Sequence, residues 1–235
     1  MTRVLLFDID NTLLYTGGAG SLAMTLALHE MLGVNDGFEK SSNTSGRTDL
    51  FILSEGLRQH GIEGGLEVHL DDFLGRYYTI LPGALRQKEG YLMPGFPQLL
   101  EALSKRPDVR LSLATGNFSE AAHIKLDYYG IDRFFDGGGF GEESLQRRVV
   151  VRAAIDRTAE GVPPEDILVF GDTPHDISSA LDNGVVAVGV ATGSYSVEEL
   201  RKSGAQMVFD DFSDWEAVAA MLCGQAGSPA RRNSR

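Results

Sequence analysis

Short apolar segments alternate with helical patterns over most of this chain of 235 residues, and this alternation limits the fold more than any other feature. The segments that predict strands are 3–8, 109–115, 133–138, 166–172, 185–192 and 205–210. The segments with a helical pattern are 96–105, 119–130, 147–159 and 213–222. Near-continuous apolar strands separated by helices indicate a parallel sheet with helices on both faces. We therefore predict an α/β fold with a doubly wound parallel sheet.

One long stretch interrupts the alternation. Its three amphipathic patterns predict helices over 21–32, 49–61 and 66–81, without a convincing strand. We interpret residues 16–92 as a helical cap domain, inserted into a catalytic core that consists of residues 1–15 and 93–223. Residues 224–235 lack an apolar pattern, and we expect them to form a disordered tail.

The composition excludes several classes of partner. A formal net charge of -12 disfavours nucleic acid and anionic membranes, because both require a basic surface. The single cysteine, Cys223, rules out an internal disulfide, and no apolar run approaches the roughly 20 residues of a membrane span. We expect a cytoplasmic protein without a signal peptide, a monomer or homodimer, that acts on a small molecule.

Polar residues follow three of the predicted strands. They are Asp8 and Asp10 after the first, Thr115, Gly116 and Asn117 after the second, and Asp172 and Asp176 after the fourth. The carboxyl ends of parallel strands meet at one edge of the sheet, where such folds bind ligands. Four carboxylates this close cannot all stay ionised without a cation. The set therefore predicts a divalent metal site, and oxygen ligands favour Mg²⁺.

Three segments resemble the motifs of the haloacid dehalogenase-like hydrolase superfamily. They are "DIDNT" (8–12), "LSLATGN" (111–117) and "VFGDTPHD" (169–176). The similarity extends over residues 1 to about 222, and the general pattern resembles the phosphoglycolate phosphatase-like subgroup. The resemblance implies a Rossmann-like core with a type 1 helical cap that closes over the site.

The resemblance also implies a role for each strand-end residue. Asp8 is expected to attack phosphorus, and Asp10 to protonate the leaving group and then accept a proton from water. Thr115 and the backbone amides of Gly116 and Asn117 are expected to hold the phosphoryl oxygens.

The metal ligands carried over from the family are Asp8, Asp172 and the backbone carbonyl of Asp10, with Asp176 supporting them from outside the first layer of ligands. The family's third motif is a basic residue, usually lysine. Counting back from Asp172 leads to Arg147, the first residue of a predicted helix. Lys125 is the competing candidate, although we interpret it as a surface residue of the helix at 119–130.

Arg47 lies in the predicted cap, within "SGRTD" (45–49). It is a candidate for binding a substrate carboxylate or a second phosphate, and the alternative is a solvated loop arginine. The function predicted from the sequence is a Mg²⁺-dependent phosphatase for a small phosphorylated metabolite, with phosphoglycolate as one candidate. The first alternative is a sugar phosphomutase of the same superfamily, and a non-catalytic binding protein is the second.

Overall fold

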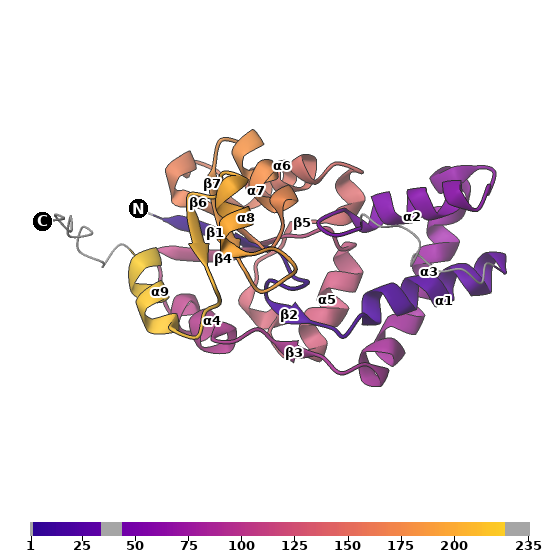
Figure 1. Cartoon of the computed structure of the whole chain (residues 1–235), viewed down its shortest axis with the longest axis horizontal. Helices are drawn as coiled ribbons and strands as arrows, with labels where there is room; N and C mark the ends of the chain where they lie inside the picture. Colours follow the sequence, from indigo (N-terminus) through magenta and orange to yellow (C-terminus); the bar gives the residue numbers. More distant parts are fainter. Residues whose placement is uncertain (1, 34–43, 224–235) are drawn as a thin grey trace, which may run out of the picture.

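The computed structural model describes residues 2–33 and 44–223, and a parallel sheet of six strands lies at its centre (Figure 1). The strand order is β5-β4-β1-β6-β7-β8. The bounds are β1 Arg3–Phe7, β4 Val109–Ala114, β5 Gly138–Gly139, β6 Ile167–Gly171, β7 Val186–Val190 and β8 Met207–Phe209. All neighbouring strands pair in parallel, which confirms the predicted doubly wound α/β fold.

Helices cover both faces of the sheet. Successive side chains of β1 point alternately to the two faces and so pack against different groups of helices. Leu5 and Phe7 belong to one hydrophobic cluster, to which α4 (Phe96–Ser104), α5 (Ser119–Tyr128) and α9 (Trp215–Leu222) contribute. Val4 and Leu6 belong to another, to which α6 (Arg147–Thr158), α7 (Pro174–Asp182) and α8 (Val197–Lys202) contribute. Successive side chains of a strand point to opposite faces, so burial of both faces requires an unbroken apolar run.

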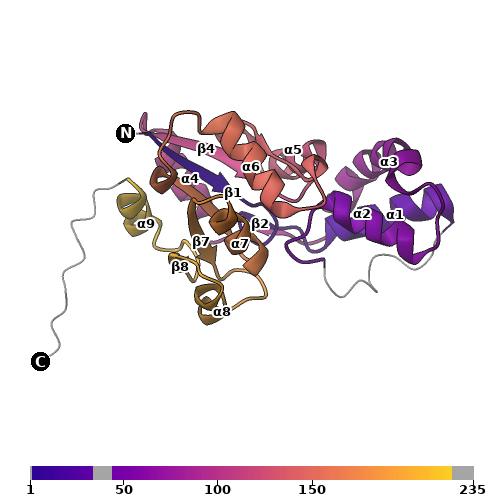
Figure 2. The ribbon, with the colours of Figure 1, turned by 90° about the horizontal axis from the view of Figure 1, so that it is seen from above.

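Three helices form the predicted helical cap: α1 (Ala19–Leu32), α2 (Asp49–Gln59) and α3 (Gly65–Gln87). Figure 2 shows them together beyond the end to which the β1 arrow points. They share a hydrophobic cluster that includes Leu28, Leu53 and Phe73, and Phe118 and Ala121 of the core join it. The cap therefore packs directly against α5 and the loop that precedes it.

A short antiparallel ribbon carries the chain into and out of the cap. It pairs β2 (Leu14–Tyr15) with β3 (Tyr91–Leu92), which the sequence analysis did not predict. Beside it, Gly17 has a φ of 65°, and a Cβ there would lie 2.3 Å from the Glu89 carbonyl oxygen. The cap boundaries at residues 16 and 92 stay a prediction. Strand β2 lies just before the first boundary and β3 forms the last two residues of the predicted cap, so the ribbon joins the two predicted domains.

The prediction of a strand over 133–138 was wrong. Residues 132–134 form a 3-10 turn, and the edge strand is the glycine pair 138–139. A Cβ on Gly138 would lie 2.3 Å from the carbonyl oxygen of Leu113, so only glycine allows this close pairing. The aromatic residues of the predicted strand serve the core instead, since Phe135 packs edge-on against Phe7 at 6.1 Å.

Two helices escaped prediction because they are short and carry few apolar residues. Both begin with a capping box, formed by Thr173 and Asp176 in α7 and by Ser196 and Glu199 in α8. Within residues 2–33 and 44–223, no helix combines the length and apolar character that a membrane span requires. The predicted tail, 224–235, lies outside the described residues.

Candidate active site

A cavity of about 690 Å³ lies between the carboxyl ends of the central strands and the cap. From the core it is lined by, among others, Asp8, Asp10, Gly116, Asn117, Lys125, Arg147 and Asp172. From the cap it is lined by, among others, Gly20, Arg47, Asp49 and Tyr77. The topology therefore brings most of the predicted site residues to one place, Arg47 included, together with Gly20, Asp49 and Tyr77 of the cap, which were not predicted.

Three buried carboxylates form one cluster at this edge. Asp8, Asp172 and Asp176 each offer an oxygen within 4.8 Å of the other two. Burial raises the pKa of Asp8 to about 6, and burial together with the charges of Asp176 and Asp8 raises that of Asp172 to about 8. Such shifts mean that the negative charge is incompletely balanced, which is the condition under which carboxylates bind a divalent cation.

Arg147 is the fixed cation of this cluster. It begins α6, and its Nη2 donates to Asp8 Oδ1 at 2.6 Å and to the Ala114 carbonyl at 2.9 Å, and pairs with Asp176 Oδ1 at 2.9 Å. Burial opposes the guanidinium charge, yet Asp8 and Asp176 raise the pKa of Arg147 above its ordinary value. A Cβ at Gly116 would lie 2.6 Å from Nη1, so the small residue at 116 makes room for the guanidinium.

The other two acids of the cluster differ in how they are held. Asp176 Oδ2 accepts bonds from Thr173, from the backbone N–H at 3.1 Å and from Oγ1 at 2.7 Å, so both of its oxygens are engaged. Asp172 packs against Gly193, where a Cβ would lie 1.8 Å from its Oδ2. The sequence analysis missed Gly193, because its need for glycine comes only from this tertiary contact.

Asp10 stands apart from the cluster and has its own donors. Its Oδ2 accepts from Asn117 Nδ2 at 2.8 Å and from Lys125 Nζ at 2.6 Å. The interpretation of Lys125 as a surface residue was wrong, because its residue exposure is only 3%. Helix α5 is covered by the sheet on one side and by the cap on another, so Lys125 points into the site although its helix pattern looks half solvated. Arg147 and Lys125 were alternatives for one position in the sequence analysis. In the structure both lie in the site, Arg147 beside Asp8 and Lys125 beside Asp10.

Asn117 organises the end of β4. Its backbone N–H and Nδ2 donate to Thr115 Oγ1, at 3.3 and 2.9 Å, and its backbone carbonyl accepts from the Gly141 N–H at 2.6 Å. Thr115 is fully buried behind Asn117 and does not line the cavity, whereas Gly116 and Asn117 do.

The start of α2 docks on the core next to Gly116. The Asp49 N–H donates to the Gly116 carbonyl at 2.7 Å, and Asp49 Oδ2 accepts from the Phe118 N–H at 3.1 Å. Burial raises the pKa of the Asp49 carboxyl to about 7, although the charge of Lys125 opposes the shift. The sequence at 48–49 predicts a helix start, and Thr48 does cap it, with its Oγ1 accepting from the Phe51 N–H at 3.2 Å, but no local signal shows that Asp49 is buried against the core.

Arg47 lines the cavity from the same segment. Its guanidinium lies over the Phe51 ring, 4.8 Å from the centroid, and its Nε is buried without a hydrogen-bond partner among the described residues. Gly46 has a φ of 71°, and a Cβ there would lie 2.4 Å from Thr173 Oγ1. The segment is therefore packed against the core and does not hold a freely solvated arginine.

The chain is similar to several known proteins in sequence and fold. Residues 5–181 match the family model described as haloacid dehalogenase-like hydrolase. A phosphoglycolate phosphatase of Rhodospirillum rubrum is 29% identical over 92% of this chain and 91% of its own length. A 5'-nucleotidase of Pseudomonas aeruginosa is 33% identical over 48% of this chain and 51% of its own length. The crystal structure of a hydrolase from Pseudomonas syringae has a TM-score of 0.71 at 22% identity, covering 97% of this chain and 100% of that one.

Proposed function

Because the chain belongs to the haloacid dehalogenase-like hydrolases and is a phosphatase among them, we propose that it cleaves a small phosphate monoester through an aspartyl phosphate on Asp8. The observation that carries the proposal is the separate partnering of the two opening aspartates. Asp8 is buried against Arg147, whereas Asp10 is held by Asn117 and Lys125 at the border of the cavity. A nucleophile and an acid need such different surroundings.

The two aspartates divide the reaction between them. An Asp8 carboxylate oxygen forms a bond to phosphorus as the ester oxygen departs, and that oxygen takes its proton from Asp10. Water then attacks the phosphorus, gives a proton to Asp10 and releases the Asp8 carboxylate with inorganic phosphate. Each residue ends as it began, so the cycle consumes only water and ester.

We assign Mg²⁺ to the carboxylate cluster. The incompletely balanced charge of Asp8 and Asp172 fits a hard divalent cation, and these two residues would hold it with the backbone carbonyl of Asp10. When bound, the ion supplies positive charge that offsets the phosphate dianion. Asp176 remains a supporting residue, because both of its oxygens are already engaged by Arg147 and Thr173.

The phosphoryl oxygens are assigned to the loop after β4 and to Arg147. Gly116 and Asn117 line the cavity, and we assign their backbone N–H groups to the phosphoryl oxygens, while Thr115 acts through Asn117, whose side chain it binds. Arg147 already touches Asp8, so its guanidinium is placed beside the atom that receives the phosphoryl group.

We propose a substrate that carries a carboxylate, with 2-phosphoglycolate as the first compound to test. One support is the relative in Rhodospirillum rubrum, a phosphoglycolate phosphatase. The other is Arg47, which lines the cavity from the cap and whose buried Nε has no hydrogen-bond partner within residues 2–33 and 44–223. A guanidinium pairs well with a carboxylate, and the same group would stabilise a second phosphate.

The test is to incubate the enzyme with Mg²⁺ and 2-phosphoglycolate, follow phosphate release, and quench in acid to trap phosphorylated Asp8 for mass spectrometry. We expect turnover in the wild type, no phosphorylated Asp8 in Asp8→Asn, and turnover reduced by about 10² to 10⁴ in Asp10→Asn. A phosphorylated residue other than Asp8 would refute the mechanism. Isomerisation of a sugar phosphate without phosphate release would favour the phosphomutase alternative.

A further inference from the structure

Lys125 is buried in the site, but the proposed reaction gives it no role. Its side chain is 4% exposed, and its ammonium lies inside the cavity wall between core and cap. Placing a lysine in such a position is costly unless its charge and its donors are satisfied. The groups that contact the Lys125 ammonium therefore indicate its function.

The ammonium satisfies two acceptors that are bonded to each other. Lys125 Nζ donates to Asp10 Oδ2 at 2.6 Å and to Asn117 Oδ1 at 2.5 Å. Asn117 Nδ2 in turn donates to the same Asp10 oxygen at 2.8 Å. The three side chains form a closed triangle. Lys125 Nζ and Asn117 Nδ2 both donate to Asp10 Oδ2, so these two bonds leave Asp10 Oδ1 unoccupied.

The cap covers this triangle from the other side. A Cβ at Gly20, in the first turn of α1, would lie 3.3 Å from Lys125 Nζ and 3.8 Å from the Tyr77 hydroxyl. Phe118, which precedes α5, packs edge-on against Tyr77 at 6.4 Å. Helix α5 thus brings Lys125 to the place where the cap meets the acid of the core.

We propose that Lys125 is a positioning residue for Asp10. With Asn117 it fixes Oδ2, which orients the Asp10 carboxyl group so that Oδ1 faces the leaving oxygen. Lys125 itself transfers no proton in this scheme. Its position under α1 and Tyr77 makes this orientation depend on the cap being packed against the core. The inference rests on the proposed function, because it requires Asp10 to be the general acid and base.

The position of Lys125 separates this role from that of Arg147. Arg147 contacts Asp8 and Asp176, and Lys125 contacts Asp10, with no hydrogen bond or ion pair recorded from either cation to the other's aspartate among the described residues. Loss of Arg147 should weaken phosphoryl transfer to any leaving group. Loss of Lys125 should weaken only what depends on the proton of Asp10.

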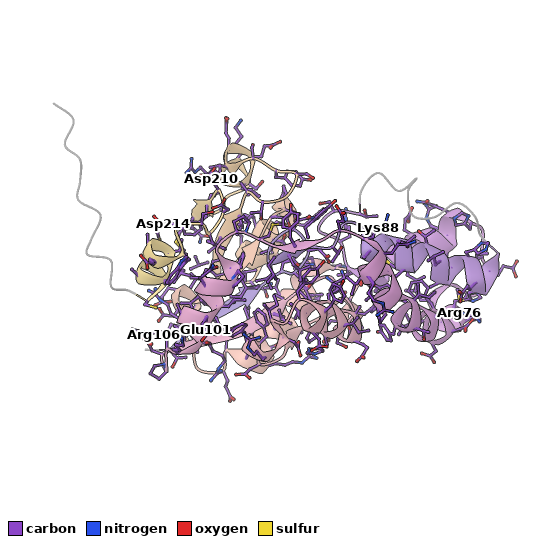
Figure 3. All side chains as sticks on the ribbon, turned by 90° about the horizontal axis from the view of Figure 1, so that it is seen from below. Arg76, Lys88, Glu101, Arg106, Asp210 and Asp214 are labelled. Carbon is purple, nitrogen blue, oxygen red and sulfur yellow. The ribbon has the colours of Figure 1, made fainter. Side chains whose placement is uncertain are left out.

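The experiment compares phenyl phosphate with 4-nitrophenyl phosphate, which are similar in size but differ in how much the leaving group needs a proton. Lys125→Met should lower kcat on phenyl phosphate by roughly 10- to 100-fold more than on 4-nitrophenyl phosphate, because a displaced acid loses its alignment. In the double variant with Asp10→Asn, the Lys125 substitution should add little further loss on phenyl phosphate. Lys105→Met is the matched control, because it removes a lysine that lies outside the site. The Lys105 side chain is 70% exposed and pairs with Glu101, and Figure 3 labels Glu101 on the catalytic core.

A second variant avoids the risk that Lys125→Met fails to fold. Alanine is a better helix former than glycine, so Gly20→Ala is compatible with α1, while its Cβ would lie 3.3 Å from the Lys125 ammonium. We expect it to fold normally and to show a smaller loss with the same preference for the poorer leaving group.

Equal losses on both esters in the two variants, or full additivity of Lys125→Met and Asp10→Asn, would overturn the role of Lys125. If instead Asp10→Asn itself shows no leaving-group dependence in an otherwise active enzyme, the proposed acid role fails. The two failures are therefore distinguishable from one set of kinetic data.

Discussion

Replacing Arg147 by methionine removes the cation that two buried carboxylates share. The guanidinium contacts Asp8 at 2.6 Å and Asp176 at 2.9 Å, and all three residues are at least nine-tenths buried. Asp8 and Arg147 line the cavity but expose less than a tenth of their surface, so water takes over the contact only in part. In the variant, the carboxylates therefore remain unpaired or must take up protons.

The expected cost follows from that burial. Removing one partner of a buried ion pair typically destabilises a protein by about 3 to 5 kcal/mol, whereas an exposed pair is worth about 0 to 1. We expect Arg147→Met to lose an amount in the first range at pH 7.5 in EDTA. Saturating Mg²⁺ should narrow this stability difference between variant and wild type, because removal of a positive charge strengthens cation binding, and each tenfold tighter Kd of the variant returns about 1.4 kcal/mol.

The assay is urea unfolding in EDTA and in Mg²⁺, with Arg148→Met as the matched control. Arg148 is the next residue of α6 and is exposed, with its Nε donating to Gln146 at 2.9 Å, so its loss should stay within about 0.5 kcal/mol. The same variants should differ in turnover, with Arg147→Met losing about 10² to 10³ in kcat. A stability loss in Arg147→Met no larger than that of the control would refute the reasoning.

Three further predictions concern the metal, the cap and the substrate. Chelation should abolish activity and Mg²⁺ should restore it, whereas Ca²⁺, with its larger and more flexible coordination, should inhibit; full turnover in excess EDTA would contradict the metal assignment. The pKa of Asp49 is raised to about 7, so the folded state holds a proton there that the unfolded state has released. The contribution of Asp49 to the free energy of unfolding is therefore complete below about pH 4 and is lost as the pH rises through 7. Over this interval the free energy of unfolding falls by at most about 1.4 kcal/mol per pH unit. Asp49→Asn should flatten this part of the pH profile of unfolding, and an unchanged slope would show that Asp49 does not titrate there. Arg47→Met should raise KM for 2-phosphoglycolate but leave KM for 4-nitrophenyl phosphate nearly unchanged, with exposed Arg58→Met as control; equal effects on both esters would exclude a carboxylate contact.

The sequence was sufficient for the sheet and for the meeting of Asp8, Asp172 and Asp176. Both follow from local patterns, because short apolar runs that alternate with helical segments indicate strands buried on both faces, and the ends of such parallel strands lie at one edge. Helices α2 and α3 of the insert were equally readable from their amphipathic periodicity, whereas the sequence of α1 shows little contrast between its faces. By contrast, β5 was misplaced, since a pair of glycines gives no apolar signal and its pairing depends on how closely the backbone of β4 can approach.

Tertiary structure alone decided how the charges of the site are divided. Sequence reasoning grouped four carboxylates with one cation, whereas the fold gives Arg147 to the cluster around Asp8 and Lys125 to Asp10. It also buries Asp49 of the cap against the backbone of Phe118. A helix pattern reports which side of a helix is apolar, but it cannot report that a second unit covers the polar side. Lys125 and Asp49 both lie where cap meets core, so their burial depends on packing between segments far apart in the chain.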